Sequence, residues 1–180
     1  MYGLVNKAMQ ELVLRNHGEE MWNRIRTKAG LEDEEIIGLK SYPDSLTYDL
    51  VRIGSEELGV KPEELLEFFG EHWITHTAAS GYENVLDLGG NNLTDFLHNL
   101  NVIHMKITHL MPSMVPPSFK VKNESANRIE LLYFSDRPGL QPMVVGILRG
   151  LGRRFDLDVK IRNLGVDVDF PSGILFELTW

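Results

Sequence analysis

Residues 93–111 read LTDFLHNLNVIHMKITHLM, and their apolar side chains recur at steps of three and four positions. This spacing predicts one helix with a continuous apolar face. His104 lies inside that face, with Leu100 and Ile107 one turn away on either side. The helix therefore directs an imidazole toward the interior of the protein.

The chain before this helix is also predicted to be helical. The same spacing, the Pro62-Glu63 helix start and the breaks at Gly18, Gly54 and Gly59 divide it into segments. Gly70 falls inside the last segment, where a glycine costs up to about 1 kcal/mol and is explained by close packing or by a hinge. Helices are expected near residues 2–16, 18–29, 45–53 and 62–79.

Beyond Pro117 the apolar period changes from that of a helix to that of a strand. One helix, near residues 140–155, is expected among the strands, and the hairpin-like spacing indicates an antiparallel sheet. The predicted fold class is α+β, helical first and sheet-containing second. Strands are expected at residues 119–122, 129–133, 159–161 and 174–178.

Composition limits the function. A chain of 180 residues with 43% hydrophobic residues fits a single domain, and its net charge of −8 argues against nucleic acid and anionic membranes as partners. The absence of cysteine excludes thiolate metal sites and thiolate nucleophiles, so a metal ligand must be histidine or a carboxylate. No stretch reaches the length of a membrane helix, and no signal peptide is visible, which leads us to expect a cytoplasmic protein.

Residues 133–137, YFSDR, supply a second candidate group. Tyr133, Ser135 and Arg137 alternate, so on a strand they would share one face and present two hydroxyls and a guanidinium together. Such a set can bind two carboxylates. Taken alone, it also fits an ordinary solvent-facing strand, just as a single histidine on an apolar face is usually a hydrogen-bonded core residue.

Other patterns are weaker. His72 and His76 have metal-ligand spacing, but Trp73 stands where a zinc hydrolase has its glutamate. Gly146, Gly150 and Gly152 do not follow a strand in the way that a dinucleotide-binding loop requires. We call Tyr133, Ser135 and Arg137 the clamp. Together with the His104 helix, the clamp fits an iron porphyrin, which needs an axial nitrogen for its iron and partners for its propionates.

Several separate segments, which span nearly the whole chain, resemble the heme nitric oxide/oxygen binding (H-NOX) family. The pattern is most similar to the heme domain of the soluble guanylate cyclase β subunit. The segments are Met1-Tyr2-Gly3-Leu4-Val5-Asn6, residues 44–51 (DSLTYDLV), Ser80-Gly81-Tyr82, Asp95-Phe96-Leu97 onward to His104, residues 116–119 (PPSF), 133–137 and Gly139-Leu140-Gln141.

The resemblance implies a single H-NOX domain over residues 1–180 that encloses heme b. Residues 1–60 would form a distal helical subdomain, and residues 61–180 a proximal subdomain with a four-stranded antiparallel sheet. His104 would be the axial iron ligand, Tyr133, Ser135 and Arg137 would hold the propionates, and Pro117 would press on the porphyrin. The other expected cofactor-binding residues are Val5, Met9, Trp73, Thr77, Leu100, Met143 and Val145.

Which gas binds is expected to depend on the residues of the distal side, the side of the porphyrin opposite His104. Oxygen-binding family members place a tyrosine there, whereas this sequence has Pro142, with Met143 next. Loss of a donor worth about 1.5–3 kcal/mol would weaken oxygen binding roughly 10- to 150-fold, so we predict that nitric oxide and CO bind at a five-coordinate ferrous heme and that oxygen is excluded. Trp73 either fills this pocket or donates its indole N–H to the ligand.

By resemblance, gas binding would weaken the bond to His104 and shift the two subdomains. The signal would pass to a protein in trans, such as a histidine kinase or a diguanylate cyclase, or the chain is an excised domain. The expected role is sensing rather than catalysis. The alternatives are an oxygen-binding heme protein, a heme peroxidase that uses His72 or His76, and an interaction module without a chromophore.

Overall fold

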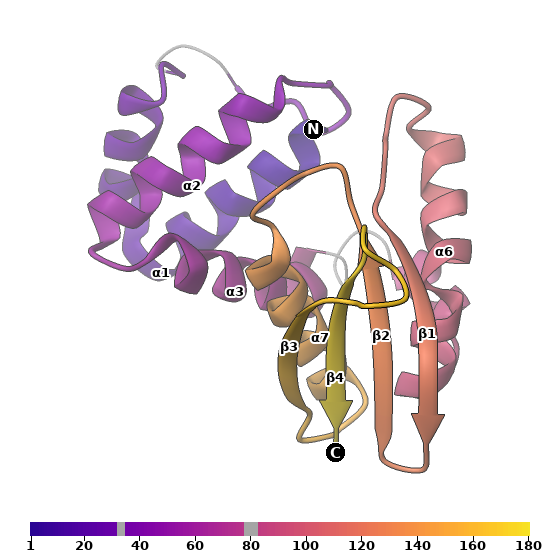
Figure 1. The fold of residues 1–180 in the computed structure, drawn as a ribbon. Coiled ribbons are helices and arrows are strands. Elements are labelled where there is room, and N and C mark those ends of the chain that lie inside the picture. The colour runs from indigo at the N-terminus through magenta and orange to yellow at the C-terminus, as the bar shows by residue number, and fades with distance from the viewer. Residues whose placement is uncertain (32–34, 78–82) are drawn as a thin grey trace.

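The computed structural model describes residues 1–31, 35–77 and 83–180, and it has the predicted α+β fold (Figure 1). Helices dominate the first part of the chain, and a four-stranded sheet lies in the second. The helical elements are α1 (Gly3–Lys28), α2 (Asp44–Leu58), α3 (Pro62–His72), the π-helix η1 (Trp73–Thr77), α5 (Glu83–Leu86), the short 3-10 helix η2 (Asp87–Gly89), α6 (Leu93–Leu110) and α7 (Gln141–Arg154). The strands are β1 (Ser118–Ser125), β2 (Arg128–Phe134), β3 (Lys160–Val166) and β4 (Ile174–Thr179).

The first helix bends where the sequence predicted a break. Gly18 has φ 80° and ψ 178°, which is not helical, so α1 consists of two arms joined at this glycine. Its buried residues follow the helical period that predicted it, with Met9 and Val13 on one arm and Trp22 and Ile25 on the other.

The predicted interruption at Gly54 is wrong. Helix α2 continues through Gly54 and ends at Gly59, which adopts the left-handed conformation with φ 67°. A Cβ placed on Gly54 would lie 3.2 Å from Leu65 Cδ2, so this position is in close contact with α3. Tertiary packing thus outweighs the low helix propensity of glycine here.

Helix α3 begins at Pro62 as predicted, but it ends as an α-helix at His72. A π-helix takes over from Trp73 to Thr77. The prediction extended this helix to Ala79, and residues 78–82, which include the Ser80-Gly81-Tyr82 segment, lie outside the described residues.

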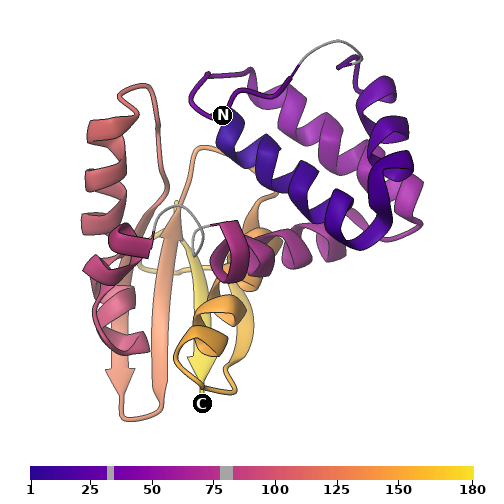
Figure 2. The ribbon, with the colours of Figure 1, turned by 180° about the vertical axis from the view of Figure 1, so that it is seen from behind.

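The sheet is antiparallel throughout, as predicted, and its strand order is β1-β2-β4-β3. One face carries Ile129, Leu131, Tyr133 and Phe176, all at most 4% exposed. Helices α6 and α7 cover that face and share its hydrophobic core (Figure 2). Strand β1 lies next to the His104 helix, and β2 is its neighbour in the sheet.

Helix α3 connects the helical part to the sheet-containing part. Its Leu65 and Phe69 share a core with α1 and α2, and its Gly70 contacts the backbone of α7. In Figure 1, α3 runs beneath α1 and α2 toward α7. It therefore packs on both sides of the boundary proposed between residues 60 and 61. None of the helices that the structure describes is long and apolar enough to cross a membrane.

Candidate functional site

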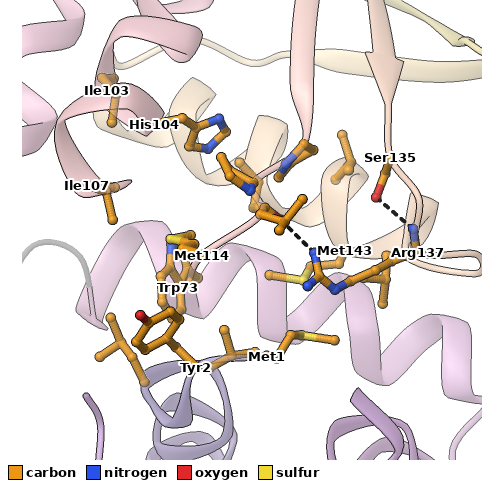
Figure 3. A pocket seen from close by; sticks show the side chains of 18 of the residues that line it. Met1, Tyr2, Trp73, Ile103, His104, Ile107, Met114, Ser135, Arg137 and Met143 are labelled. Atoms are coloured by element: carbon orange, nitrogen blue, oxygen red, sulfur yellow. Dashed lines mark hydrogen bonds between the residues drawn. The ribbon is translucent and has the colours of Figure 1, made fainter. Parts of the chain in front are cut away.

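A cavity of about 440 Å³ lies between the start of α1, η1, α6, α7 and the segment that joins α6 to β1 (Figure 3). Its volume is within the range of small-molecule and cofactor sites, and most of its lining side chains are apolar. Polar groups gather at the end formed by Ser135 and Arg137. A ligand that fits must be largely apolar, with its polar atoms at one end.

His104 enters this cavity from α6, because the helical period places it on the same face as Leu100 and Ile107. Its Nδ1 atom is buried and has no hydrogen-bond partner in the described part of the chain. Burial lowers the pKa of His104, and the carbonyl of Pro117 opposes part of this shift. The ring is therefore neutral at pH 7 and offers a nitrogen lone pair, which is the form that binds metals.

The three clamp residues all line the cavity, but not as the face of one strand. Strand β2 ends at Phe134, one residue beyond the predicted strand 129–133, so of the three only Tyr133 belongs to it and the shared strand face considered for them does not form. The chain turns here, and the Arg137 N–H donates to Ser135 Oγ at 3.1 Å. Burial raises the pKa of Tyr133, which remains a neutral hydroxyl donor.

Arg137 is oriented by partners from distant parts of the chain. Its Nε donates to Asp44 Oδ2 at 2.8 Å and its Nη1 to the Val115 carbonyl at 2.6 Å. The Met1 ammonium and the Arg137 guanidinium hold the pKa of Asp44 below its ordinary value. Asp44 also lines the cavity, yet no local pattern predicted it, because it lies 93 positions from Arg137 in the sequence.

The wall opposite α6 is formed by α1, η1 and α7. Of the residues predicted for it, Val5, Trp73 and Met143 line the cavity. Trp73 also packs edge-on against Phe69, with ring centroids 6.2 Å apart. Leu100 and Pro117 line the cavity too, on the His104 side.

Two predicted residues with described side chains do not line the cavity. Met9 is 2% exposed and lies in the core between α1 and α3. Val145 packs against the core beside the sheet. The side chain of Thr77 lies outside the described residues.

The period of α7 explains which of its residues reach the cavity. The lining positions of α7 are separated by one, three and four residues, so they share one helical face, and Leu140 precedes them by three. Pro142 is not on this face, whereas Met143 is. This helical spacing can be read from the sequence, but it identifies the lining residues only once the side of α7 that faces His104 is known. The lining residues of α7 are Met143, Val144, Ile147 and Leu148.

His72 and His76 lie outside the cavity lining. Their rings stack with centroids 4.6 Å apart and an interplanar angle of 13°. Burial, then the neighbouring charges of His76 and Arg15, lowers the pKa of His72 to about 4. Within the described ranges no cluster of three or more His, Asp or Glu side chains is arranged to hold a metal ion. A peroxidase acid–base histidine would need to face the cavity, and neither residue does.

These observations fit heme. His104 lines the cavity as a neutral imidazole and is an available axial ligand. Apolar walls on both sides suit a flat macrocycle, and hydroxyls and a guanidinium at one end suit its two propionates. The donor set and its arrangement match a single-histidine heme pocket.

Comparison with known proteins agrees with this geometry. The family model described as Haem-NO-binding matches residues 2–163. Soluble guanylate cyclase gcy-32 of Caenorhabditis elegans is 32% identical over 165 residues, which is 89% of this chain and 24% of that relative. The guanylate cyclase soluble subunit beta-2 of Rattus norvegicus is 35% identical over 106 residues, 58% of this chain and 16% of the subunit.

Solved structures share the fold. An H-NOX protein from S. oneidensis in the Fe(II)NO ligation state has a TM-score of 0.87 at 21% identity, over 99% of this chain and 98% of that one. The chain thus spans about a quarter of the length of gcy-32, but nearly all of the S. oneidensis structure.

Proposed function

Because this chain belongs to the haem-NO-binding (H-NOX) family of heme-based gas sensor domains, we propose that it binds heme b and senses nitric oxide. The observation that carries the proposal is the cavity that brings His104 and the Tyr133, Ser135 and Arg137 clamp together. CO is the second expected ligand. The role is sensing, and no catalytic activity is assigned to the chain.

In this proposal each residue has a defined task. His104 binds the iron through its neutral imidazole, and Tyr133, Ser135 and Arg137 bind the propionates. Pro117 lies on the His104 side and presses against the ring. Heme, when bound, supplies an iron with an open coordination position for a diatomic gas. Val5 and Trp73 shape the space on the gas side.

The side of the cavity opposite His104, formed by α1, η1 and α7, favours nitric oxide over oxygen as the ligand. Apart from Trp73, the described residues that α7 and η1 contribute to the lining have no N–H or O–H side-chain donor. Tyr2, which precedes α1, also lines the cavity; its hydroxyl accepts the Ser113 N–H at 3.2 Å and keeps its own O–H as a donor. Bound oxygen draws negative charge and needs a donor far more than nitric oxide does, so oxygen should bind weakly. An oxygen-binding heme protein remains the second candidate, since Trp73 carries an indole N–H and Tyr2 a hydroxyl.

An absorption spectrum of the reduced, heme-loaded protein tests both candidates. We expect a heme spectrum that changes on addition of nitric oxide or CO and forms no stable oxygenated species in air. A stable oxygenated spectrum would favour the second candidate. A purified protein that retains no heme after expression with iron and heme precursor would refute both.

We further propose that residues 1–60 and 61–180 act as two subdomains whose relative position carries the signal. Two hydrogen bonds across that boundary support this: the Arg137–Asp44 pair and the Tyr48 hydroxyl, which donates to the Pro138 carbonyl at 2.9 Å. Two differently favoured arrangements would make a switch. The proposed receiver is a separate signalling protein such as a histidine kinase or a diguanylate cyclase in the cytoplasm. Limited proteolysis with and without nitric oxide would detect the change.

A further inference from the structure

Two histidines lie at the junction of α3 and η1, outside the cavity lining. His72 is the last residue of α3 and His76 is the fourth residue of η1. Residues four positions apart share one face of a helix, and the two imidazole rings are nearly parallel, with centroids 4.6 Å apart. Trp73 and Ile74, which stand between them in the sequence, line the cavity instead. The junction therefore presents a histidine pair on one face and part of the cavity wall on another.

The position of the proton on the His76 ring is fixed by two hydrogen bonds. The Thr75 hydroxyl has a single proton, which it donates to the Glu71 carbonyl at 2.9 Å. Its oxygen lies 2.8 Å from His76 Nδ1, so it accepts from that nitrogen, and Nδ1 carries the proton of the neutral ring. The lone pair of Nε2 is then free to bind a cation. A hydrogen bond made by the second ring nitrogen is the usual support of a metal-binding histidine.

The His72 ring is buried without compensation from hydrogen bonds. His72 is 7% exposed. Its pKa is lowered to about 4 by burial and, to a smaller extent, by the charges of His76 and Arg15, with no hydrogen bond from a described residue among the causes. The ring is therefore neutral at pH 7 and has a lone pair of its own. Because a buried polar group without a partner costs free energy, a cation at this nitrogen would remove an existing penalty.

The chemistry of the pair indicates which ligand it would take. Neutral imidazole is a preferred ligand of zinc, copper and nickel, which it binds at about 2.0–2.1 Å in the case of zinc. The described residues place no third His, Asp or Glu side chain in a metal-binding group here, so water would complete the coordination. Arg15 opposes a bound cation, but only weakly, because its side chain is exposed to solvent and its charge is the smallest cause of the His72 shift.

We propose that His72 and His76 form a two-histidine site for a divalent transition metal of the zinc and copper class. The site spans the junction at which the α-helix gives way to the π-helix, a rare conformation that is often found at functional sites. A metal bound to both rings joins the end of α3 to η1. It thereby restrains the segment that carries Trp73.

Metal binding at this pair does not require heme, since neither histidine lines the cavity. Its effect on gas binding rests on the proposed function, because Trp73 is part of the wall opposite His104. A restrained η1 would hold the Trp73 indole in one position beside the gas. The metal would thus regulate the heme site from behind its wall.

Calorimetric titration of the heme-loaded, untagged protein with Zn(II) tests the site. Heme occupies His104 in this sample, so that residue does not compete for the metal. We expect one zinc ion per chain, and we expect its binding to be lost in His72→Gln and in His76→Gln. His98→Gln is the matched control, since His98 is exposed and pairs with Glu124 at 2.7 Å, which makes it another place where zinc could bind.

The hydroxyl of Thr75 supplies a second test, which a purely structural histidine pair would not pass. Thr75→Val removes the acceptor of the His76 Nδ1 proton and should weaken zinc binding about 10- to 100-fold. Thr75→Ser keeps the hydroxyl and should bind zinc like the parent. Equal zinc affinity in Thr75→Val and Thr75→Ser would overturn the role given to this hydrogen bond and with it the inference.

A stability measurement on the unmodified protein does not depend on any variant folding. Zinc at ten times its dissociation constant should raise the melting temperature by about 3–6 °C. His76 is only partly buried, so His76→Gln is the variant better able to fold, and its melting temperature should not respond to zinc.

The outcomes separate this inference from the proposed function. A heme-loaded parent protein that binds no zinc, or that loses zinc only in His98→Gln, would overturn the site and leave the gas sensor intact. Zinc binding that is lost in His76→Gln, in a protein that retains no heme, would support the site and refute the proposed function. In that case His104→Gln serves as the background for the titration, because it removes the histidine that heme would have occupied.

Discussion

The two sides of the cavity differ in how their functional groups are positioned. On the side of α6 and β2, Arg137 is fixed by hydrogen bonds to Asp44 and Val115, and its backbone N–H donates to Ser135. On the opposite side, α1, η1 and α7 present mainly apolar groups, positioned by helix packing at Gly70 and Gly146. The polar side is suited to holding a cofactor, and the apolar side to choosing its ligand.

This difference shows why retention of heme and selection of a gas can be altered separately. A change on the polar side should affect how much cofactor is bound. A change on the apolar side should leave the cofactor in place and alter which gas it accepts, or alter the packing of α3 on α7. The predictions below test this separation.

The largest effect is expected from His104→Gly. Removal of the imidazole takes away the one described nitrogen ligand of the cavity, so the axial bond is lost and the ferrous spectrum changes completely. Added imidazole should restore the spectrum by entering the vacated space. His109→Gly, at an exposed position of the same helix, is the control and should keep the parental spectrum. A His104→Gly protein with the parental spectrum and heme affinity would remove His104 from this role.

Arg137→Gln tests the other part of the polar side. Loss of a charged hydrogen-bond donor worth about 1.5–3 kcal/mol should weaken heme binding roughly 10- to 150-fold. The heme dissociation constant, measured by competition with an acceptor of known affinity, reports this. Arg149→Gln is the matched control, since Arg149 pairs with Glu67 and does not line the cavity. Equal losses in the two variants would mean that the clamp has no specific part in binding heme.

Local patterns in the sequence predicted most of the fold. The helical period of residues 93–111 placed His104 on the inner face of α6, and the strand pattern predicted all four strands in an antiparallel sheet. Gly54 was misread because its place in a helix depends on contact with Leu65, which a local pattern does not contain.

The site was less predictable than the fold. The clamp residues were identified and the end of β2 was predicted to within one residue, but the turn that follows it was not, because a turn after a strand depends on distant packing. Asp44 belongs to a segment that carries the resemblance, but its place beside Arg137 was not predicted, since the two are far apart in the sequence. Met143 lines the cavity and Pro142 does not, a distinction that needs the orientation of α7 relative to α6.

Gly70→Ala is expected to act on the apolar side alone. A methyl group at this position meets the Met143 carbonyl at the helix crossing, and overpacking of this kind costs about 1–3 kcal/mol. The melting temperature of the heme-loaded protein should fall, and the ferrous spectrum should shift as Met143 moves. In Gly38→Ala the nearest atom is Leu4 Cα at 4.0 Å, so that variant should melt like the parent. Unchanged stability in Gly70→Ala would show that the crossing can open without cost.

The smallest expected effect is a pH dependence of the stability of the folded protein, which arises from His72 at the end of α3. The pKa of His72 is lowered to about 4 in the folded protein, below the ordinary value of 6.5 that it regains on unfolding. Between these values the unfolded chain binds more protons, so stability falls as pH drops from about 6.5 toward 4. Protonation of His72 should weaken the packing of α3, which is followed directly by η1 and Trp73.

Thermal unfolding at pH 7 and pH 5 measures this effect, and His72→Gln should reduce the difference in melting temperature between the two. His17→Gln, at an exposed position of α1, should not. If heme is retained at pH 5 while the melting temperature falls, the two sides of the cavity respond separately to acid. If His72→Gln and the parent lose stability equally, the acid-sensitive group lies elsewhere, and packing behind η1 does not depend on a neutral His72.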